Sequence, residues 1–300
     1  MTPPLTLLET LPEPLERSLA ELRACLDQLE RVVVAYSGGV DSALVAALAV
    51  DRLGDRALAI TGVSPALAPH LREEARWQAR WLGLRHREIP TAELADPAYA
   101  SNPEQRCYAC KWQLHSLLAP IAAAAAGARV LDGVNLDDLG DHRPGIQAAR
   151  EHGVISPLAL HGIDKSGVRR LSRALGLPWW DKPAQPCLAS RFPYGEPVNA
   201  SRLVRVAAAE DWLRKQGWPE IRVRSQGEAA RIELPADVLP SALARLASDG
   251  LRLELVEAFL EFGFHAVGLD LEGLVSGKLN RDLASPSPPG PGGPEQGNAP

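Results

Sequence analysis

The segment VVVAYSGGVDSALVAAL, residues 32–48, restricts the fold of this chain more than any other stretch. It begins with a run rich in β-branched residues, which is typical of a strand covered on both faces. Two glycines follow, and the apolar pattern then predicts a helix from Asp41 to about Leu53, closed by Gly54. Because glycine lets the backbone approach a ligand closely, this strand–turn–helix unit predicts a binding turn.

The turn is predicted to bind an anion, and a phosphate fits best. The helix presents free N–H groups and the positive end of its dipole to the turn. Gly38 and Gly39 give the close approach, Ser37 and Ser42 add hydroxyl donors, and Asp41 is a candidate Mg²⁺ ligand. The GxxxxGK[ST] spacing of a Walker A loop is missing. The alternative is a tight turn whose serines only cap the helix.

The rest of the pattern predicts an α/β fold. Strands are predicted at 32–37, 57–63, 86–90 and 128–134, and helices at 13–30, 41–53, 70–83 and about 111–126. Such alternation indicates a parallel sheet with crossover helices. Near residue 195 the pattern changes to a smaller α+β unit, with helices at 201–217 and 236–261 and strands on both sides of Gly227 and at 265–271. The predicted domains are therefore 1–195 and 196–283, followed by a disordered tail at 284–300.

Composition limits the class of protein. The chain has 37 acidic and 32 basic residues and a net charge of −5, which argues against a broad nucleic-acid surface. Neither a signal peptide nor a membrane-spanning apolar stretch is recognisable, so a cytoplasmic location is expected. Four cysteines in 300 residues are too few for a secreted disulfide scaffold. Reduced thiols or metal ligands are the expected use.

Three of the four cysteines form a candidate site. Cys107 and Cys110 make a CxxC in NPEQRCYACK, Cys187 lies in PCLASRFPYG, and Cys25 lies beside a predicted apolar helix stripe. A CxxC alone fits a redox pair, half a zinc site or two buried thiols. Structural zinc needs four ligands, and no nearby histidine is spaced to complete the set. An iron–sulfur cluster held by three thiolates would leave one iron open.

The phosphate turn resembles that of a known superfamily. SGGVDS resembles the pyrophosphate loop of PP-loop ATPases, which have an adenine nucleotide alpha-hydrolase-like, Rossmann-like sheet and cleave ATP to AMP and pyrophosphate. TGVSP, with Ser64, ends the second strand where these enzymes hold the adenine. The segment at 156–178, with Lys165 at its helix start, resembles their second phosphate-contacting segment. Without the resemblance, Lys165 would equally fit a solvated surface lysine.

A narrower resemblance covers residues 20–282. SGGVDS, NPEQRCYACK, LDGVNLDDLGDHRPG, PCLASRFPYG, IRVR and ARIELP together resemble the LarE family of ATP-dependent sulfur transferases. The resemblance implies adenylation of the carboxylates of pyridinium-3,5-dicarboxylate mononucleotide and their conversion to thiocarboxylates for the nickel pincer nucleotide cofactor of lactate racemase. It also implies a sulfide donor, nickel-insertion and lactate racemase pathway proteins as partners, and a homo-oligomer.

The family resemblance leaves two sulfur sources open. In members that have only the PCLASR-like cysteine, this cysteine gives up its sulfur and is left as dehydroalanine, which ends activity after one turnover. Members that also have the RCYxCK pair hold a [4Fe–4S] cluster, whose open iron carries a replaceable sulfide. Because Cys107, Cys110 and Cys187 are all present, the cluster version is expected, with these cysteines as ligands and catalytic residues.

A substrate with one phosphate and two carboxylates predicts a cationic clamp. Arg222 and Arg224 alternate along a predicted strand and so share a face, where paired guanidinium groups can grip a phosphate. A salt-bridged sheet face is the alternative. Arg191 is either a carboxylate ligand or part of a structural ion pair. The acids of the loop after the fourth strand, Asp132, Asp138 and Asp141, are either metal or substrate contacts or helix caps, and His142 is assigned no proton transfer.

Three other functions are compatible with the motifs. A tRNA-thiolating PP-loop enzyme also binds clusters through three cysteines, but this chain is acidic and has no appended RNA module. An amidotransferase-like synthetase of the same fold would not explain the three cysteines. A non-catalytic nucleotide-sensing metalloprotein would not release pyrophosphate in response to a carboxylate substrate.

Overall fold

The computed structural model describes residues 5–140, 144–275, 278 and 281. It divides into two compact units, residues 1–211 and 212–300. The division falls inside helix α9 (Ala200–Lys215), later than the predicted change near residue 195. The first turns of α9 carry Glu210, which is bonded to Arg191 of the first unit. The predicted tail at 284–300 lies outside the described residues.

The first unit contains the predicted parallel sheet. Its strands are β1 (Val32–Ala35), β2 (Ala57–Val63), β3 (Arg85–Pro90) and β4 (Arg129–Leu131). They lie in the order β3-β2-β1-β4, and all three pairings are parallel. The chain moves outward from β1 through β2 to β3 and then returns to the other side of β1. The order therefore reverses between β1 and β4, which is where open α/β sheets bind ligands at their carboxyl ends.

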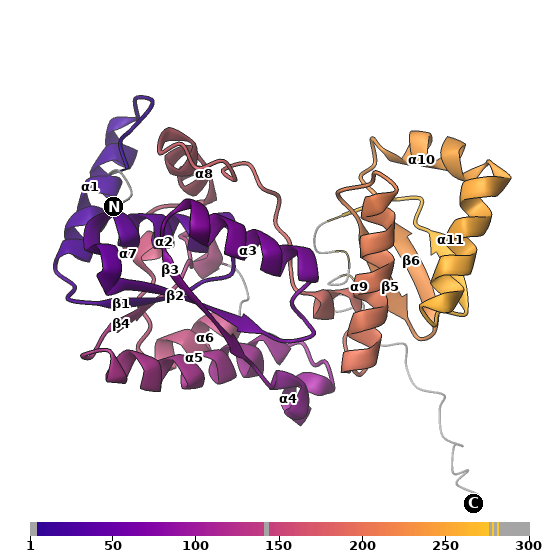
Figure 1. The fold of residues 1–300 in the computed structure, drawn as a ribbon, viewed down its shortest axis with the longest axis horizontal. Helices are drawn as coiled ribbons and strands as arrows, with labels where there is room; N and C mark the ends of the chain where they lie inside the picture. Colours follow the sequence, from indigo (N-terminus) through magenta and orange to yellow (C-terminus); the bar gives the residue numbers. More distant parts are fainter. Residues whose placement is uncertain (1–4, 141–143, 276–277, 279–280, 282–300) are drawn as a thin grey trace, which may run out of the picture. The chain divides into compact units, whose positions relative to one another are not determined.

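Helices cover both faces of this sheet (Figure 1). Val32 and Val34 belong to one core, with α1 (Glu13–Asp27), α2 (Val40–Leu53), α3 (Pro69–Trp81) and α8 (Lys165–Ala174). Val33 points to the opposite core, which includes Leu118 of α5 (Arg106–Ala124), and α6 (Pro144–Glu151) packs against α5. Burial on both faces explains why the β1 segment is an unbroken apolar run.

The helix predicted near 111–126 begins earlier, at Arg106, so the CxxC lies in the first two turns of α5. Asn102, at φ 57°, separates it from the short helix α4 (Pro97–Ala100). The remaining short elements of the first unit are α7 (Pro157–Leu160) and the 3₁₀ helices η1 (Gly54–Arg56), η2 (Glu93–Ala95), η3 (Asp137–Gly140) and η4 (Leu188–Arg191).

The second unit is the predicted smaller α+β fold. Its strands β5 (Arg222–Gln226), β6 (Ala229–Glu233) and β7 (Ala266–Leu269) form one sheet in that order, with β5 and β6 antiparallel and β6 and β7 parallel. The single helix predicted at 236–261 is two helices, α10 (Leu239–Leu246) and α11 (Asp249–Glu261). Extended backbone at Ser248, the N-cap of α11, separates them. Across the described ranges, no helix has the length and apolar character needed to cross a membrane.

His115, on the helix that carries the CxxC, gives a pH-dependent prediction. It is buried, and its Nδ1 has no hydrogen-bond partner in the described ranges. Burial, with smaller effects of Lys111 and His152, lowers its pKa from 6.5 to about 3. Because the folded state binds this proton more weakly, the stabilisation is complete above about pH 6.5 and is lost as the pH falls towards 3. Between pH 7.5 and 5 the wild type should lose about 2 kcal/mol more unfolding free energy than His115→Gln. Urea unfolding at both values measures this, and equal losses would contradict it.

Candidate functional site

The phosphate turn is held by its own side chains. Ser42 Oγ accepts from Ser37 N at 3.2 Å, lies 3.0 Å from Ser37 Oγ and donates to Gly39 O at 3.2 Å. Gly39 is the N-cap of α2 and has no side-chain cap. The serines therefore order the turn, whereas within the part of the chain that the structure describes the N-cap of α2 makes no side-chain cap bond. This agrees with an anion site rather than with serines that only cap a helix.

Gly38 requires glycine for two reasons. Its φ is +71°, and a Cβ there would lie 2.9 Å from Ala75 Cβ of α3. Its carbonyl accepts from Gln78 Nε2 at 3.1 Å and from Lys182 Nζ at 3.2 Å, and Lys182 also pairs with Glu74 at 2.7 Å. Sequence reasoning missed Gln78 and Lys182, because only the packing of α3 and of the segment before Cys187 brings them to the turn.

Asp41 and Lys165 meet although they are distant in sequence. Lys165 Nζ lies 2.5 Å from Asp41 Oδ2, and Asn135 Nδ2 donates to Asp41 Oδ1 at 3.0 Å. Asp137 Oδ2 accepts from Lys165 N at 3.0 Å, which fixes the start of α8. The loop after β4 thus joins both charged groups, at the point where the strand order reverses. One carboxylate and one ammonium beside a phosphate turn suit Mg²⁺ and phosphate oxygens respectively.

Gly133 lets the loop after β4 approach the start of α2. A Cβ at Gly133 would lie 2.6 Å from Ser42 N and 2.9 Å from the Asp41 carbonyl carbon, whereas a Cβ at Gly140 would meet nothing within 4 Å. Because backbone atoms cannot give way locally, Gly133→Ala should lower stability by about 1–3 kcal/mol and weaken ATP binding. Gly140→Ala is the matched control and should change neither. Thermal unfolding and ATP titration measure both, and an unchanged Gly133→Ala would contradict the close approach.

Ser64 links the end of β2 to a buried acid. Its Oγ donates to Glu93 Oε1 at 2.5 Å and accepts from Ala66 N at 3.2 Å. Glu93 is buried, and its Oε2 has no hydrogen-bond partner among the described residues. Ala66 O in turn accepts from Leu188 N at 2.8 Å. The loop that leaves β2 is therefore bonded directly to the residue after Cys187.

The three candidate cysteines lie in one neighbourhood. Cys107 and Cys187 are exposed and Cys110 is half-buried. Burial, opposed by Lys111 and assisted by the charges of Cys187, Glu93 and Cys107, raises the pKa of the Cys110 thiol to about 12. No group of three His, Cys, Asp or Glu side chains in the described part of the chain is close enough to hold a single metal ion. The thiols thus interact through space without forming the compact ligand set of one ion.

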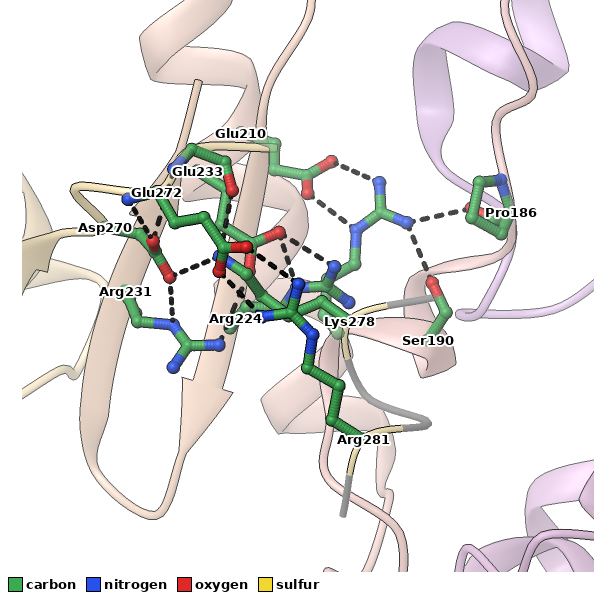
Figure 2. Close-up of polar contacts among 12 residues, drawn as sticks. Pro186, Ser190, Glu210, Arg224, Arg231, Glu233, Asp270, Glu272, Lys278 and Arg281 are labelled. Carbon is green, nitrogen blue, oxygen red and sulfur yellow. Dashed lines mark hydrogen bonds and ion pairs between the residues drawn. The ribbon is translucent and has the colours of Figure 1, made fainter. Parts of the chain in front are cut away.

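Arg191 forms a structural ion pair, which is one of the two roles that the sequence left open. Its Nε and Nη2 donate to Glu210 Oε1 and Oε2 at 2.8 and 3.1 Å, and both side chains are buried. Its Nη1 donates to Pro186 O and to Ser190 Oγ, each at 3.0 Å; these contacts are drawn in Figure 2. Because Pro186 precedes Cys187, this guanidinium braces the cysteine loop. A substrate contact of Arg191 stays a prediction.

In the second unit, Arg222 and Arg224 share one sheet face, as predicted, because they pair in register with Glu233 and Arg231. Arg224 donates from Nε and Nη2 to buried Glu233 Oε2 at 2.9 and 2.8 Å. Further ion pairs surround this contact (Figure 2). Arg231 pairs with Glu233 and Asp270, and Arg281 pairs with Glu272. Lys278 pairs with Glu233, Asp270 and Glu272. Arg224 is therefore part of a salt-bridged face, and phosphate binding by Arg222 and Arg224 stays a prediction.

The acidic loop after β4 is only partly described. Burial raises the pKa of Asp132, whose Oδ1 accepts from Val134 N at 3.1 Å. Asp138 Oδ2 accepts from Asn135 N at 3.1 Å. Both aspartates therefore order the loop that presents Asn135 to Asp41. Asp141 and His142 lie outside the described residues.

The family model that matches this chain covers the nucleotide-binding segment but not Cys107, Cys110 or Cys187. Residues 16–106 match the NAD synthase family, a stretch that includes the phosphate turn and Ser64 and ends just before Cys107. An uncharacterized protein of Synechocystis sp. is 54% identical over 90% of this chain and 99% of its own length. The pyridinium-3,5-bisthiocarboxylic acid mononucleotide synthase of Lactiplantibacillus plantarum is 37% identical over 88% of this chain and 94% of its own. These two similarities extend far beyond the nucleotide-binding segment.

Proposed function

The chain belongs to the LarE family of ATP-dependent sulfur transferases, and from this premise we propose that it converts the carboxylates of pyridinium-3,5-dicarboxylate mononucleotide into thiocarboxylates. The products are AMP, pyrophosphate and the precursor of the nickel pincer nucleotide cofactor. One contact carries the proposal: Leu188 N donates to Ala66 O at 2.8 Å. It joins the Cys187 loop to the loop that leaves β2, the strand beside the one that enters the phosphate turn.

Activation of the carboxylate uses the phosphate turn. A carboxylate is a poor acyl donor because its charge is delocalised and its leaving group would be oxide. One carboxylate oxygen attacks the α-phosphorus of ATP, a new O–P bond forms, and pyrophosphate leaves with the electrons of the broken P–O bond. The turn at Ser37–Ser42 and Lys165 stabilise the phosphate charge, and Asp41 would hold a Mg²⁺ ion, which would supply further positive charge to the phosphates.

Sulfur transfer uses the cysteine neighbourhood. Hydrosulfide attacks the acyl carbon of the adenylate, the C–S bond forms, the C–O bond to AMP breaks with its electrons leaving on the AMP phosphate, and the S–H proton passes to water. On the alternative route the Cys187 thiol attacks and loses its proton, and removal of the Cys187 α-proton then breaks its Cβ–S bond and leaves dehydroalanine. The thiocarboxylate remains on the pyridinium ring. The bond between the Cys187 loop and the β2 loop supports the view that both reactions use one site.

Cys107, Cys110 and Cys187 would hold a [4Fe–4S] cluster. Their donor chemistry fits, because cysteine thiolates are the usual ligands of such a cluster, and the charges of Cys107 and Cys187 act on the Cys110 thiol. When bound, the cluster supplies exchangeable sulfide, so that Cys187 itself is not consumed. The alternative is that Cys187 gives up its own sulfur.

The substrate and partners complete the proposal. Arg222 and Arg224 grip the phosphate of the mononucleotide, and Arg191 contributes to the carboxylate end through the loop that it braces. A sulfide donor reloads the site in the cytoplasm, and nickel-insertion and lactate racemase pathway proteins use the product. The enzyme works as a homo-oligomer.

Substrate-dependent pyrophosphate release tests the proposed function. With ATP and Mg²⁺, release should require pyridinium-3,5-dicarboxylate mononucleotide and should be matched by thiocarboxylate. Release that is independent of this substrate, or that needs tRNA instead, would overturn it. On protein purified without oxygen, about four iron and four acid-labile sulfide per chain would support the cluster. An absence of iron after anaerobic reconstitution would favour the sacrificial route, and substantial zinc would favour a structural site.

A further inference from the structure

Asn102, in the motif NPEQRCYACK, has no role in the chemistry above and yet is fully buried. Its φ of 57° lies in the left-handed region, which asparagine tolerates better than most residues. A buried amide needs hydrogen-bond partners that offset the free-energy cost of removing it from water. One of those partners is Arg106, and the others lie about 90 residues further along the chain, on the segment that follows Cys187.

The amide of Asn102 bonds in both directions. Its Nδ2 donates to Pro193 O at 2.6 Å and lies 3.5 Å from Phe192 O. Its Oδ1 accepts from Arg106 Nη1 at 2.5 Å, and Arg106 is the first residue of α5 and directly precedes Cys107. One side chain therefore joins the start of the CxxC helix to the segment after Cys187.

Backbone bonds run beside this amide. Gly195 N donates to Asn102 O and Val198 N donates to Ala100 O, both at 2.8 Å. The Arg106 guanidinium also lies over the Tyr194 ring, with its carbon 5.3 Å from the ring centroid. The two segments thus meet along several residues, and Asn102 supplies the side-chain bonds between them.

The link from Pro193 back to Cys187 is short and ordered. Cys187 is the N-cap of η4, and Ser190 N donates to Cys187 O at 3.0 Å. Phe192 follows η4 and is fully buried. Holding Pro193 therefore fixes the position of Cys187 relative to α5. The opposite side of the loop is fixed separately, by the bond from Leu188 to Ala66.

From these contacts we propose that Asn102 is a positioning residue that holds the Cys187 loop against the start of α5, so that Cys187 faces Cys107 and Cys110. The inference rests on the proposed function for its chemistry, but the placement of the thiols does not depend on it. Asn102 acts through these contacts and touches no reacting atom.

The test is thiol cross-linking in the full chain without a cluster, in a Cys25→Ser, Cys107→Ser background that retains Cys110 and Cys187. Dibromobimane becomes fluorescent only when both of its arms have reacted, whereas monobromobimane reports each thiol separately. Asn102→Gly keeps the left-handed backbone and removes the amide. We expect about tenfold less cross-link, because two side-chain bonds that dock the loop are lost, with monobromobimane labelling unchanged.

Two further variants make the result decisive. Asn102→Asp is nearly isosteric but turns an oxygen towards Pro193 O, so it should reduce cross-linking too, and it decides the matter if Asn102→Gly does not fold. Ser101→Ala is the matched control, because among the described residues the Ser101 hydroxyl bonds only to Pro97 O, within its own turn, at 2.8 Å. It should cross-link like the parent. Parent-like cross-linking in a folded Asn102 variant would overturn the proposal.

A second readout separates positioning from general loss of stability. In the complete enzyme with all four cysteines, Asn102→Asp should release pyrophosphate at the normal rate while forming about tenfold less thiocarboxylate per pyrophosphate. If pyrophosphate release and thiocarboxylate formation fell by the same factor, the role of Asn102 would be structural only, and the proposal would be overturned. If the proposed function itself fails, neither product depends on the mononucleotide, whereas the cross-linking result still stands or falls on its own.

Discussion

Cys187→Ala is expected to abolish thiocarboxylate formation while pyrophosphate release continues. The backbone contacts that hold the loop, from Leu188 N to Ala66 O and from Arg191 to Pro186 O, do not involve the cysteine side chain. The phosphate turn, Asp41 and Lys165 lie on other segments. Only the sulfur chemistry should therefore be lost. Parallel assays of pyrophosphate and thiocarboxylate on the same sample measure the separation.

Companion variants distinguish the two sulfur sources. If the three cysteines hold a cluster, Cys107→Ala and Cys110→Ala should lose iron and sulfur transfer as fully as Cys187→Ala. If Cys187 gives up its own sulfur, these two variants should retain one turnover. In the wild-type chain, residue 187 should then be dehydroalanine, which mass spectrometry detects. Cys25→Ala is the control and should behave as wild type. Repeated turnover by Cys187→Ala would contradict both routes.

Asp41→Asn should reduce pyrophosphate release roughly a hundredfold to a thousandfold, the usual effect of losing one charge that stabilises a transferring group. The Asp41 carboxylate pairs with Lys165 at 2.5 Å, and an amide would neither hold that ammonium nor bind Mg²⁺ well. The bond from Asn135 to Oδ1 can be kept by an amide oxygen, so the fold should survive.

A Mg²⁺ titration of pyrophosphate release is the measurement for this variant. The Mg²⁺ concentration for half-maximal rate should rise in Asp41→Asn. Asp27→Asn is a matched control, because it breaks a surface ion pair with Arg52 instead and should leave both rate and Mg²⁺ dependence unchanged. A nearly normal rate for Asp41→Asn at ordinary Mg²⁺ would show that Asp41 does not hold the metal.

Local patterns predicted the phosphate turn correctly for a physical reason. The unbroken run before Ser37 reflects a strand buried on both faces, and Gly38 requires both a positive φ and the absence of a Cβ. Such demands act within a few residues and therefore leave a sequence signature. The parallel sheet and the smaller second unit were predictable on the same basis, since the period of apolar residues follows from local burial.

Contacts between distant segments were not predictable in this way. Lys182 and Gln78 reach the carbonyl of Gly38 only because α3 and the segment before Cys187 pack against the turn. The start of α5 at Arg106 was missed, and the bonds of Asn102, just before it, to Phe192 and Pro193 join segments about 90 residues apart. For Arg191 and Arg224 the sequence left substrate binding and structural ion pairs as alternatives, and only the structure shows their pairing with Glu210 and Glu233.

The sequence by itself determined where a nucleotide turn, a parallel sheet and three uncommon cysteines occur. Each follows from residue type and short-range spacing. Only the tertiary structure decided which groups meet: Lys165 with Asp41, Leu188 with Ala66, and Asn102 with the segment beyond Cys187. The reason is that a hydrogen bond or ion pair requires its atoms within about 3 Å, and the strand order that brings residues 41, 135 and 165 together is a property of the folded sheet.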